Sequence, residues 1–254
     1  MSLNKTIRII IPNIFTATNV LLGTFAIYYA FDGYSITAAY LIIIATFIDF
    51  LDGFVARLVN GQSDFGKQFD SLSDLISFGI APAAILYNLF SRDVASPEII
   101  VNEQNIIPFF AFLLVIFSAT RLARFNTDSE QKTSFKGLPT PANALIIASI
   151  PLMMANMCKC TLLYQTLSDT YFLIGYIIIA SIFMNINVRM LSLKFSNLKL
   201  KDNLFRYLLI ITTLVSIVVI IFIYNLHFGF ALASVMILYI LFSLSELVIC
   251  EKKT

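Results

Sequence analysis

Four aspartates in one polar stretch of an otherwise apolar chain have the spacing of a site on paired helices. Asp49 and Asp52 are three residues apart and Asp70 and Asp74 are four apart, so each pair shares one face of a helix. The segment between the pairs is rich in Gly, Asn, Gln and Ser, a composition that ends a helix and turns the chain. The sequence therefore predicts a helical hairpin that brings the four carboxylates together.

Such a cluster needs positive charge to be stable. Two unit charges about 4 Å apart repel by ~4 kcal/mol at an effective dielectric constant near 20. A carboxylate inside a membrane costs about 2.5–3.5 kcal/mol even on a lenient scale. Hard oxygen ligands on rigid helices suit Mg²⁺ or Mn²⁺, and two such ions offset four negative charges. We therefore predict two divalent cations as cofactors, a site typical of phosphate or diphosphate chemistry.

The residues after Asp52 fit a phosphate ligand. Gly53 and Ala56 have little or no side chain, so a ligand or a neighbouring helix can approach their backbone closely. Arg57 follows one turn later, and its planar guanidinium suits a phosphate. Taken alone, Gly53 could serve only helix packing and Arg57 could be a charge at the membrane surface. Next to four aspartates, the set favours a diphosphate site.

The composition places these residues in a membrane protein. The chain of 254 residues has 59% hydrophobic and 13% charged residues and a mean hydropathy of +0.86, whereas soluble domains carry roughly 25% charge. Its apolar runs reach the ~20 residues that a spanning helix needs and lack the alternation of β-strands. We predict an all-α bundle of about eight spans, at 8–31, 35–58, 69–91, 106–126, 141–158, 169–189, 206–225 and 228–249.

Charge sets the predicted orientation. With the N-terminus inside, only Arg92 and Lys159 lie in outer segments, which leaves fifteen of the 17 basic residues on the inner side, as the positive-inside rule requires. We predict that both termini and the aspartates face the cytoplasm, in a bacterial-type inner membrane. Residues 8–31 are too long for a signal peptide and are read as a retained span. The net charge of +2 fits an anionic lipid surface and gives no reason to expect nucleic acid.

No linker or soluble domain interrupts the chain. We predict a six-span catalytic core at residues 1–190 and two additional C-terminal helices at 191–254, which serve packing. Cys158 and Cys160 lack the further ligands of a zinc site and are read as structural thiols. His227, the single histidine, is read as structural.

The whole stretch reads D-x2-D-G-x2-A-R-x8-G-x3-D-x3-D over residues 49–74. It resembles the signature of the CDP-alcohol phosphotransferases, with every position and both gaps intact. That resemblance implies transfer of a phosphatidyl group from CDP-diacylglycerol to an alcohol, with release of CMP. It also implies a homodimer among membrane lipids. Asp64 falls outside the pattern and is read as a loop residue.

The resemblance carries roles to individual residues. Asp49, Asp52 and Asp70 match the ligands of one metal, and Asp49, Asp70 and Asp74 match those of the second. Asp74 also matches the general base, with Asp70 beside it in the catalytic set. Gly53, Arg57 and Ser63 match positions that contact the nucleotide and diphosphate. The full set expected to bind CDP-diacylglycerol is Pro12, Asn13, Thr16, Asn19, Asp52, Gly53, Ala56, Arg57, Ser63 and Gly66.

The acceptor is read from two later segments. Arg121 and Arg124 share one helix face, and Lys136 precedes a proline-rich helix start. The plainer interpretation is positive-inside charge followed by that helix start. Residues 8–190, however, resemble the bacterial and archaeal phosphatidylserine synthases of this family. Because an arginine pair can hold a carboxylate, we predict that Arg121, Arg124 and Lys136 anchor L-serine.

Other acceptors and another class stay open at this point. Glycerol-3-phosphate or inositol phosphate would suit the same arginines, and an archaeal type would use a different CDP-linked lipid. Choline would call for an aromatic cage, and the chain has no Trp. An ion-coupled transporter also places aspartates in a membrane. It leaves the Gly53, Ala56 and Arg57 insert unexplained, and no inverted repeat is visible.

Overall fold

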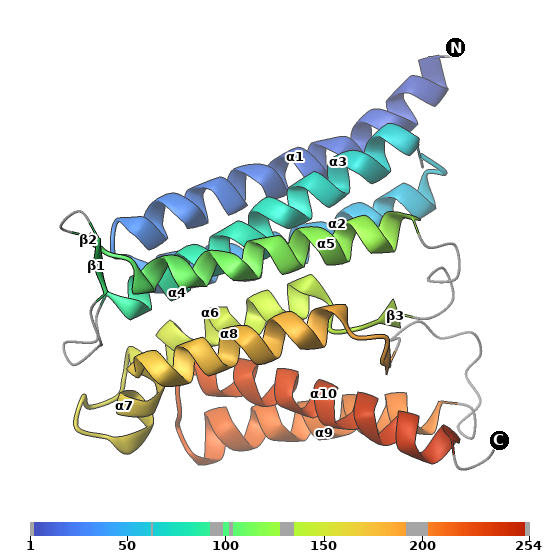
Figure 1. Cartoon of the computed structure of the whole chain (residues 1–254). Helices are drawn as coiled ribbons and strands as arrows, with labels where there is room; N and C mark the ends of the chain where they lie inside the picture. Colours follow the sequence, from blue (N-terminus) through green and yellow to red (C-terminus); the bar gives the residue numbers. More distant parts are fainter. Residues whose placement is uncertain are drawn as a thin grey trace.

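The protein is a bundle of long helices that run roughly alongside one another (Figure 1). The computed structural model describes residues 3–61, 63–91, 99–101, 104–127, 135–191 and 203–251. Within these ranges the strands are two residues long each and form two small antiparallel pairs. The predicted all-α, membrane-spanning class is confirmed.

The first half of the chain builds the layer that carries the aspartates. A π-helix, η1, joins α3 to α4 in one apolar stretch, and a 3₁₀-helix, η2, leads into α5. The elements are α1 (Leu3–Phe31), α2 (Ser35–Leu58), α3 (Asp64–Asp74), η1 (Leu75–Ile80), α4 (Ala81–Phe90), β1 (Ile100–Val101), β2 (Gln104–Asn105), η2 (Ile107–Phe112) and α5 (Leu113–Thr127).

The second half packs beneath that layer in Figure 1. Helix α6 contacts both α2 and α10, and α5 contacts α8, so the two halves share one core. The elements are β3 (Phe135–Lys136), α6 (Thr140–Met154), α7 (Leu162–Ser168), α8 (Thr170–Asn185), β4 (Arg189–Met190), α9 (Leu204–Val218), the π-helix η4 (Val219–Ile223) and α10 (Phe228–Glu251).

The predicted count of about eight spans stays a prediction, since the criteria of length and hydropathy alone identify six or seven spans among the described residues. Among the described residues, six helices are long and apolar enough to cross a membrane, or seven if the bent pair α7 and α8 counts as one. The predicted span 141–158 does not meet these criteria. It forms α6, whose 15 residues reach only about 22 Å, short of a hydrocarbon core of ~30 Å.

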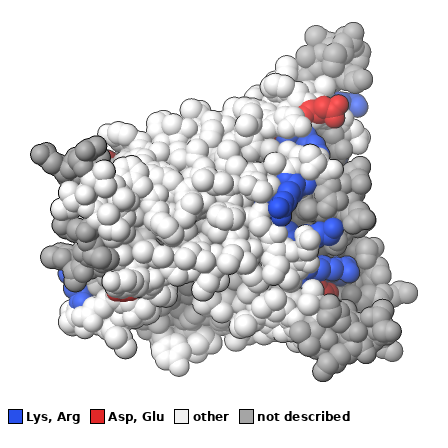
Figure 2. Space-filling view, viewed as in Figure 1, with Lys and Arg blue, Asp and Glu red and all other residues white. Residues whose placement is uncertain are grey.

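The two chain ends lie at the same end of the bundle. Helix α1 begins and α10 ends there, and the turn between α2 and α3 lies at that end as well (Figure 1). Figure 2 shows the visible Lys and Arg side chains gathered mainly at this end, next to a broad uncharged band over the middle of the helices. Several predicted inner-loop charges lie outside the described residues, namely Lys132, Lys194, Lys199, Lys201, Lys252 and Lys253.

The structure corrects the expectation for the two cysteines near Lys159. Cys158 and Cys160 form a disulfide with each other and are not the free thiols that the sequence predicts. They lie in the segment between α6 and α7, outside both helices. The C-x-C spacing alone did not distinguish a bonded pair from two thiols.

Small residues let α1 pack closely against the π-helix. A Cβ at Gly23 would meet the Ser77 side chain and its Cα, so the two backbones approach in a way that only glycine allows there. The Ser77 hydroxyl donates to the Asn19 carbonyl over 2.9 Å. This contact fixes η1, and with it the end of α3 that carries Asp74, against α1.

Strands β3 and β4 join two loops at the end of the bundle where the aspartates lie. Phe135 pairs with Met190 and Lys136 with Arg189. Beyond the pair, the Gly137 amide donates to the Val188 carbonyl over 2.8 Å and the Leu138 amide donates to the Phe183 carbonyl over 3.0 Å. The start of α6 is thereby tied to the C-terminal end of α8.

Gly137 is the residue on which this connection depends, so Gly137→Ala is expected to destabilise the protein. Its φ is +74°, and a Cβ would collide with the Met184 carbonyl. We expect a loss of about 1–3 kcal/mol, measured as a lower thermal unfolding midpoint in detergent. The matched control is Gly175→Ala on α8, where a Cβ meets nothing within 4 Å. That variant should keep or raise the midpoint, and equal losses in both variants would contradict this account.

Candidate active site

A cavity of about 1020 Å³ lies between the two halves of the bundle, bounded by α1, α2, α3, α5, α6 and α10. We call it the active-site cavity. Most of the residues that the sequence singled out line it: Pro12, Asn13, Thr16, Asp49, Asp52, Gly53, Ala56, Arg57, Ser63, Gly66, Asp70, Asp74 and Arg121. Residues of the predicted hairpin, formed by α2 and α3, thus meet residues from α1 and α5 in one place.

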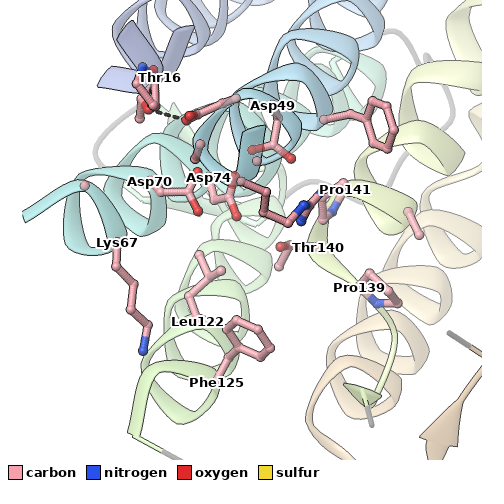
Figure 3. A pocket seen from close by; sticks show the side chains of 18 of the residues that line it. Thr16, Asp49, Lys67, Asp70, Asp74, Leu122, Phe125, Pro139, Thr140 and Pro141 are labelled. Atoms are coloured by element: carbon pink, nitrogen blue, oxygen red, sulfur yellow. Dashed lines mark hydrogen bonds between the residues drawn. The ribbon is translucent and has the colours of Figure 1, made fainter. Parts of the chain in front are cut away.

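Three carboxylates converge in this cavity. One oxygen from each of Asp49, Asp70 and Asp74 lies within 4.8 Å of the others, and Figure 3 shows the three side chains directed toward a common space. The Asp74 Oδ1 atom is buried and has no hydrogen-bond partner among the described residues. Clustered carboxylate oxygens with an unpartnered acceptor fit a hard divalent cation, since such a cation prefers oxygen ligands.

Asp52 stands apart from this group. Its carboxylate accepts a hydrogen bond from the Thr16 hydroxyl of α1, drawn as a dashed line in Figure 3. The sequence predicts four ligands, whereas the structure brings three carboxylates together and turns the fourth toward α1. Asp52 still lines the same cavity, so it links the carboxylate group to the first helix.

Two serines of the α3–η1 segment hold α1 beside the aspartates. The Ser73 hydroxyl donates to the Thr16 carbonyl over 3.3 Å, and Ser77 makes the corresponding bond to Asn19. Asn19 itself is 1% exposed, its side-chain amide has no partner among the described residues, and it does not line the cavity. The structure therefore places Asn19 in the packing between helices and not among the cavity residues where the sequence predicts it.

The turn between the two aspartate helices follows from a few local interactions. Asn60 adopts a positive φ of 50°, a conformation that Asn tolerates better than most residues. A Cβ at Gly61 would run into the Arg8 carbonyl of α1. Ser63 then caps α3 by accepting from the Gly66 amide over 3.0 Å, the usual role of Ser at a helix start. Asp64 is the first residue of α3 and lines the cavity, so its assignment to a loop is wrong.

Gly53 faces open space. A Cβ built on it would have one heavy-atom neighbour within 4 Å, the Nη1 atom of Arg57 at 3.9 Å. A glycine that serves a close helix contact would instead face another helix, as Gly23 does against Ser77. The geometry therefore favours the interpretation in which Gly53 leaves room for a ligand, with the Arg57 guanidinium beside that room.

Arg121 enters the cavity from the other half of the bundle. The side chain is 8% exposed, and its Nη1 donates to the Thr140 hydroxyl at the start of α6 over 3.3 Å. Its Nε is buried without a partner among the described residues, and the guanidinium lies within electrostatic range of Asp74. A buried guanidinium with an unused donor suits an anionic ligand.

The other two predicted acceptor residues lie elsewhere. Arg124 and Lys136 line a separate small cavity of about 20 Å³, which Arg121 also borders. The Arg124 Nη1 donates to the Asn185 carbonyl at the end of α8 over 3.3 Å. Of the three basic residues, only Arg121 lines the active-site cavity.

Several cavity residues were missed by sequence reasoning. Lys67 donates to the Asn126 carbonyl over 3.3 Å, and Thr140 holds Arg121. Figure 3 shows Thr140 between Pro139 and Pro141. Their positions in the sequence could have identified both as cavity residues, because Lys67 lies between the aspartate pairs and Thr140 lies inside the proline-rich segment. The other cavity residues to which the sequence assigned no role in the site are Phe50, Gly61, Leu122, Phe125, Ala142, Leu145, Leu191, Met236 and Tyr239.

Comparison with known proteins matches this site to one family. The sequence profile of the CDP-alcohol phosphatidyltransferases matches residues 9–191. A CDP-diacylglycerol–serine O-phosphatidyltransferase of Helicobacter pylori (strain J99) is 34% identical over 202 residues, which cover 79% of this chain and 78% of that protein. The corresponding enzyme of Methanocaldococcus jannaschii is 34% identical over 174 residues, 68% of this chain and 73% of that protein.

A third relative differs in its name. The archaetidylserine synthase of Methanothermobacter thermautotrophicus is 37% identical over 144 residues, 56% of this chain and 57% of that protein. The matched residues 9–191 contain the whole aspartate hairpin and Arg121. By profile and by identity, the chain belongs to the CDP-alcohol phosphatidyltransferase family.

Proposed function

We propose that this integral membrane transferase moves the phosphatidyl group of CDP-diacylglycerol to L-serine, forming phosphatidylserine and CMP. The observation that carries the proposal is that one cavity holds the Asp49, Asp70 and Asp74 carboxylates, the open face of Gly53 and the buried Arg121 guanidinium. The first two features suit a diphosphate with its cations, and the third suits an anionic acceptor. The relatives whose names specify serine support the choice of acceptor.

The donor is proposed to lie along α1 and α2. Asp49, Asp70 and Asp74 would hold Mg²⁺ or Mn²⁺. Asp52 would give up its hydrogen bond to Thr16 and join the ligands of a second cation. Bound there, divalent cations would withdraw charge from the diphosphate and stabilise the departing CMP. The diphosphate would pass over Gly53, next to Arg57, and the α2–α3 turn with Ser63 would contact the nucleotide.

The acceptor is proposed to lie at Arg121. The carboxylate of serine would take up the unused Nε donor of Arg121, whose position is fixed by Thr140. Asp74, within electrostatic range of Arg121, would then receive the proton of the serine hydroxyl. Arg121 thus aligns the acceptor with the base, which is the positioning that makes a transfer of this kind fast.

The reaction exchanges one phosphorus–oxygen bond for another. The serine hydroxyl oxygen bonds to the phosphorus that carries diacylglycerol, and the bond from that phosphorus to the CMP oxygen breaks. The hydroxyl proton goes to Asp74, and CMP leaves with the bonding electron pair. The active site would face the cytoplasm, where water-soluble serine and CMP are exchanged, in keeping with the Lys and Arg side chains gathered at that end of the bundle (Figure 2).

Gly53→Leu tests the donor side. We expect the KM for CDP-diacylglycerol to rise more than about tenfold, because the leucine side chain would occupy the space proposed for the diphosphate and clash with the bound donor. The thermal midpoint should stay within a few degrees, since among the described residues a Cβ at Gly53 would meet only the Arg57 side chain of the same helix. Gly175→Leu, the same change at an open position of α8, is the control and should leave KM unchanged. A large loss of stability with Gly53→Leu would mean that the glycine serves packing.

Acceptor assignment is tested directly with purified protein. The protein would receive CDP-diacylglycerol, Mg²⁺ or Mn²⁺, and one acceptor from a panel of serine, glycerol-3-phosphate, inositol phosphate and choline, and CMP release would be measured. Serine-dependent release that EDTA abolishes supports the proposal. Release only with another acceptor would overturn the serine assignment while leaving the family reaction in place. Family membership already speaks against the transporter interpretation.

A further inference from the structure

The last helix reaches the active-site cavity. Met236 and Tyr239 of α10 line it, although both lie beyond the residues 9–191 that match the family profile. They are three residues apart in one helix, so they share a face. The sequence predicts only a packing role for this helix, whereas the structure makes it part of the cavity wall.

Tyr239 is held in place by the segment that follows β4. Its hydroxyl donates to the Leu191 carbonyl over 3.3 Å. The Leu191 amide donates to the Ser243 hydroxyl over 3.2 Å, and Ser243 donates in turn to the Tyr239 carbonyl over 2.7 Å. Both polar groups of the Leu191 backbone are therefore bonded to α10, and Leu191 itself is buried and lines the cavity.

This wall lies on the acceptor side of the cavity. Helix α10 packs against α6, which begins with the Thr140 that binds Arg121. Tyr239 and Arg121 both line the active-site cavity. The aspartates and Gly53, by contrast, come from α2 and α3.

We propose that Tyr239 is a specificity-determining residue that limits the size of the alcohol bound at Arg121. The inference rests on the proposed function. The aromatic ring, fixed through Leu191, bounds the space beside the Arg121 guanidinium, so a small amino-acid alcohol fits and a longer one is excluded. The C-terminal helix pair thereby completes the acceptor half of the active site, outside the segment that defines the family.

The test uses the full-length protein in detergent with CDP-diacylglycerol and either serine or homoserine, which is longer by one methylene. Tyr239→Phe should raise the KM for serine about fivefold, the order expected when one hydrogen bond that fixes the ring is lost. Tyr239→Leu should also raise the homoserine-to-serine ratio of kcat/KM at least about fivefold, because the shortened side chain opens the wall. The KM for CDP-diacylglycerol should stay within about twofold in both variants. Tyr224→Phe, at an exposed tyrosine outside the cavity, is the control and should match the wild type.

The outcomes separate this inference from the proposed function. If the wild type releases no CMP with serine, the proposed function fails. If the wild type is active and folded Tyr239→Leu keeps the wild-type homoserine-to-serine ratio of kcat/KM, the inference about Tyr239 is wrong. It is also wrong if the KM for CDP-diacylglycerol rises as much as the KM for serine. Should Tyr239→Leu fail to fold, Tyr239→Met takes its place, since it removes the ring with a smaller loss of volume and should raise the homoserine-to-serine ratio as well.

Discussion

Asp74→Asn is expected to lower kcat by about a thousandfold, within the range that a positioned general base contributes, while the Kd for CDP-diacylglycerol stays within about threefold. The substitution keeps the shape of a half-buried side chain that lies beside Asp49 and Asp70, but an amide cannot accept the proton of the serine hydroxyl. Binding of the donor would be measured by calorimetry or by protection against thermal unfolding, and turnover by CMP release.

The control for this variant is Asp64→Asn. Asp64 also lines the cavity and is the first residue of α3, yet it lies outside the carboxylate group. Its turnover should stay within about threefold of the wild type, because a charge at the exposed start of a helix contributes little. If Asp74→Asn weakens donor binding as much as turnover, Asp74 acts chiefly as a metal ligand and the proton goes elsewhere.

Arg121→Gln is expected to lower kcat/KM for serine by about a hundredfold, with the KM for CDP-diacylglycerol within about threefold. Losing one member of a buried, hydrogen-bonded charge pair costs about 2–5 kcal/mol, and a neutral amide of similar length cannot replace the guanidinium. Arg121→Lys should recover part of the loss, because it restores the charge without the planar geometry. Steady-state kinetics with each substrate varied in turn would measure the effect.

Arg124→Gln distinguishes a specific contact from a general basic patch. Arg124 is hydrogen-bonded to the Asn185 carbonyl and lines the small neighbouring cavity, not the active-site cavity. We expect its kcat/KM for serine to fall less than about fivefold, as for an exposed charge. Equal losses at Arg121 and Arg124 would show that the acceptor is bound by the whole basic cluster, as the sequence predicts.

The sequence predicted those parts of the site that depend on local spacing. The intervals of three and four residues in the aspartate pairs placed them on helix faces, and the Gly and Asn residues between them marked the turn that Asn60 and Gly61 form. The apolar runs predicted most helices within a few residues. The span predicted at 141–158 ends early as α6, because apolar length alone does not reveal where a helix buried in a bundle stops.

What escaped prediction depends on contacts between distant segments. The bond from Thr16 to Asp52 joins residues 36 positions apart, and the bond from Tyr239 to Leu191 joins residues 48 apart. Whether Asp52 faces the other aspartates or α1 is decided by that packing, and the same holds for the separation of Arg124 from Arg121. The π-helix after Asp74 likewise packs against a distant segment, through the close contact of Ser77 with Gly23.

The most direct measurement follows an isotope in the proposed reaction. Purified protein would convert CDP-diacylglycerol and L-serine labelled with ¹⁸O in the hydroxyl group, and both products would be analysed by mass spectrometry. Attack by the serine oxygen on phosphorus predicts that phosphatidylserine keeps the ¹⁸O and that CMP carries none. A serine lipid without the label, or no serine lipid at all under conditions where CMP is released, would contradict the account.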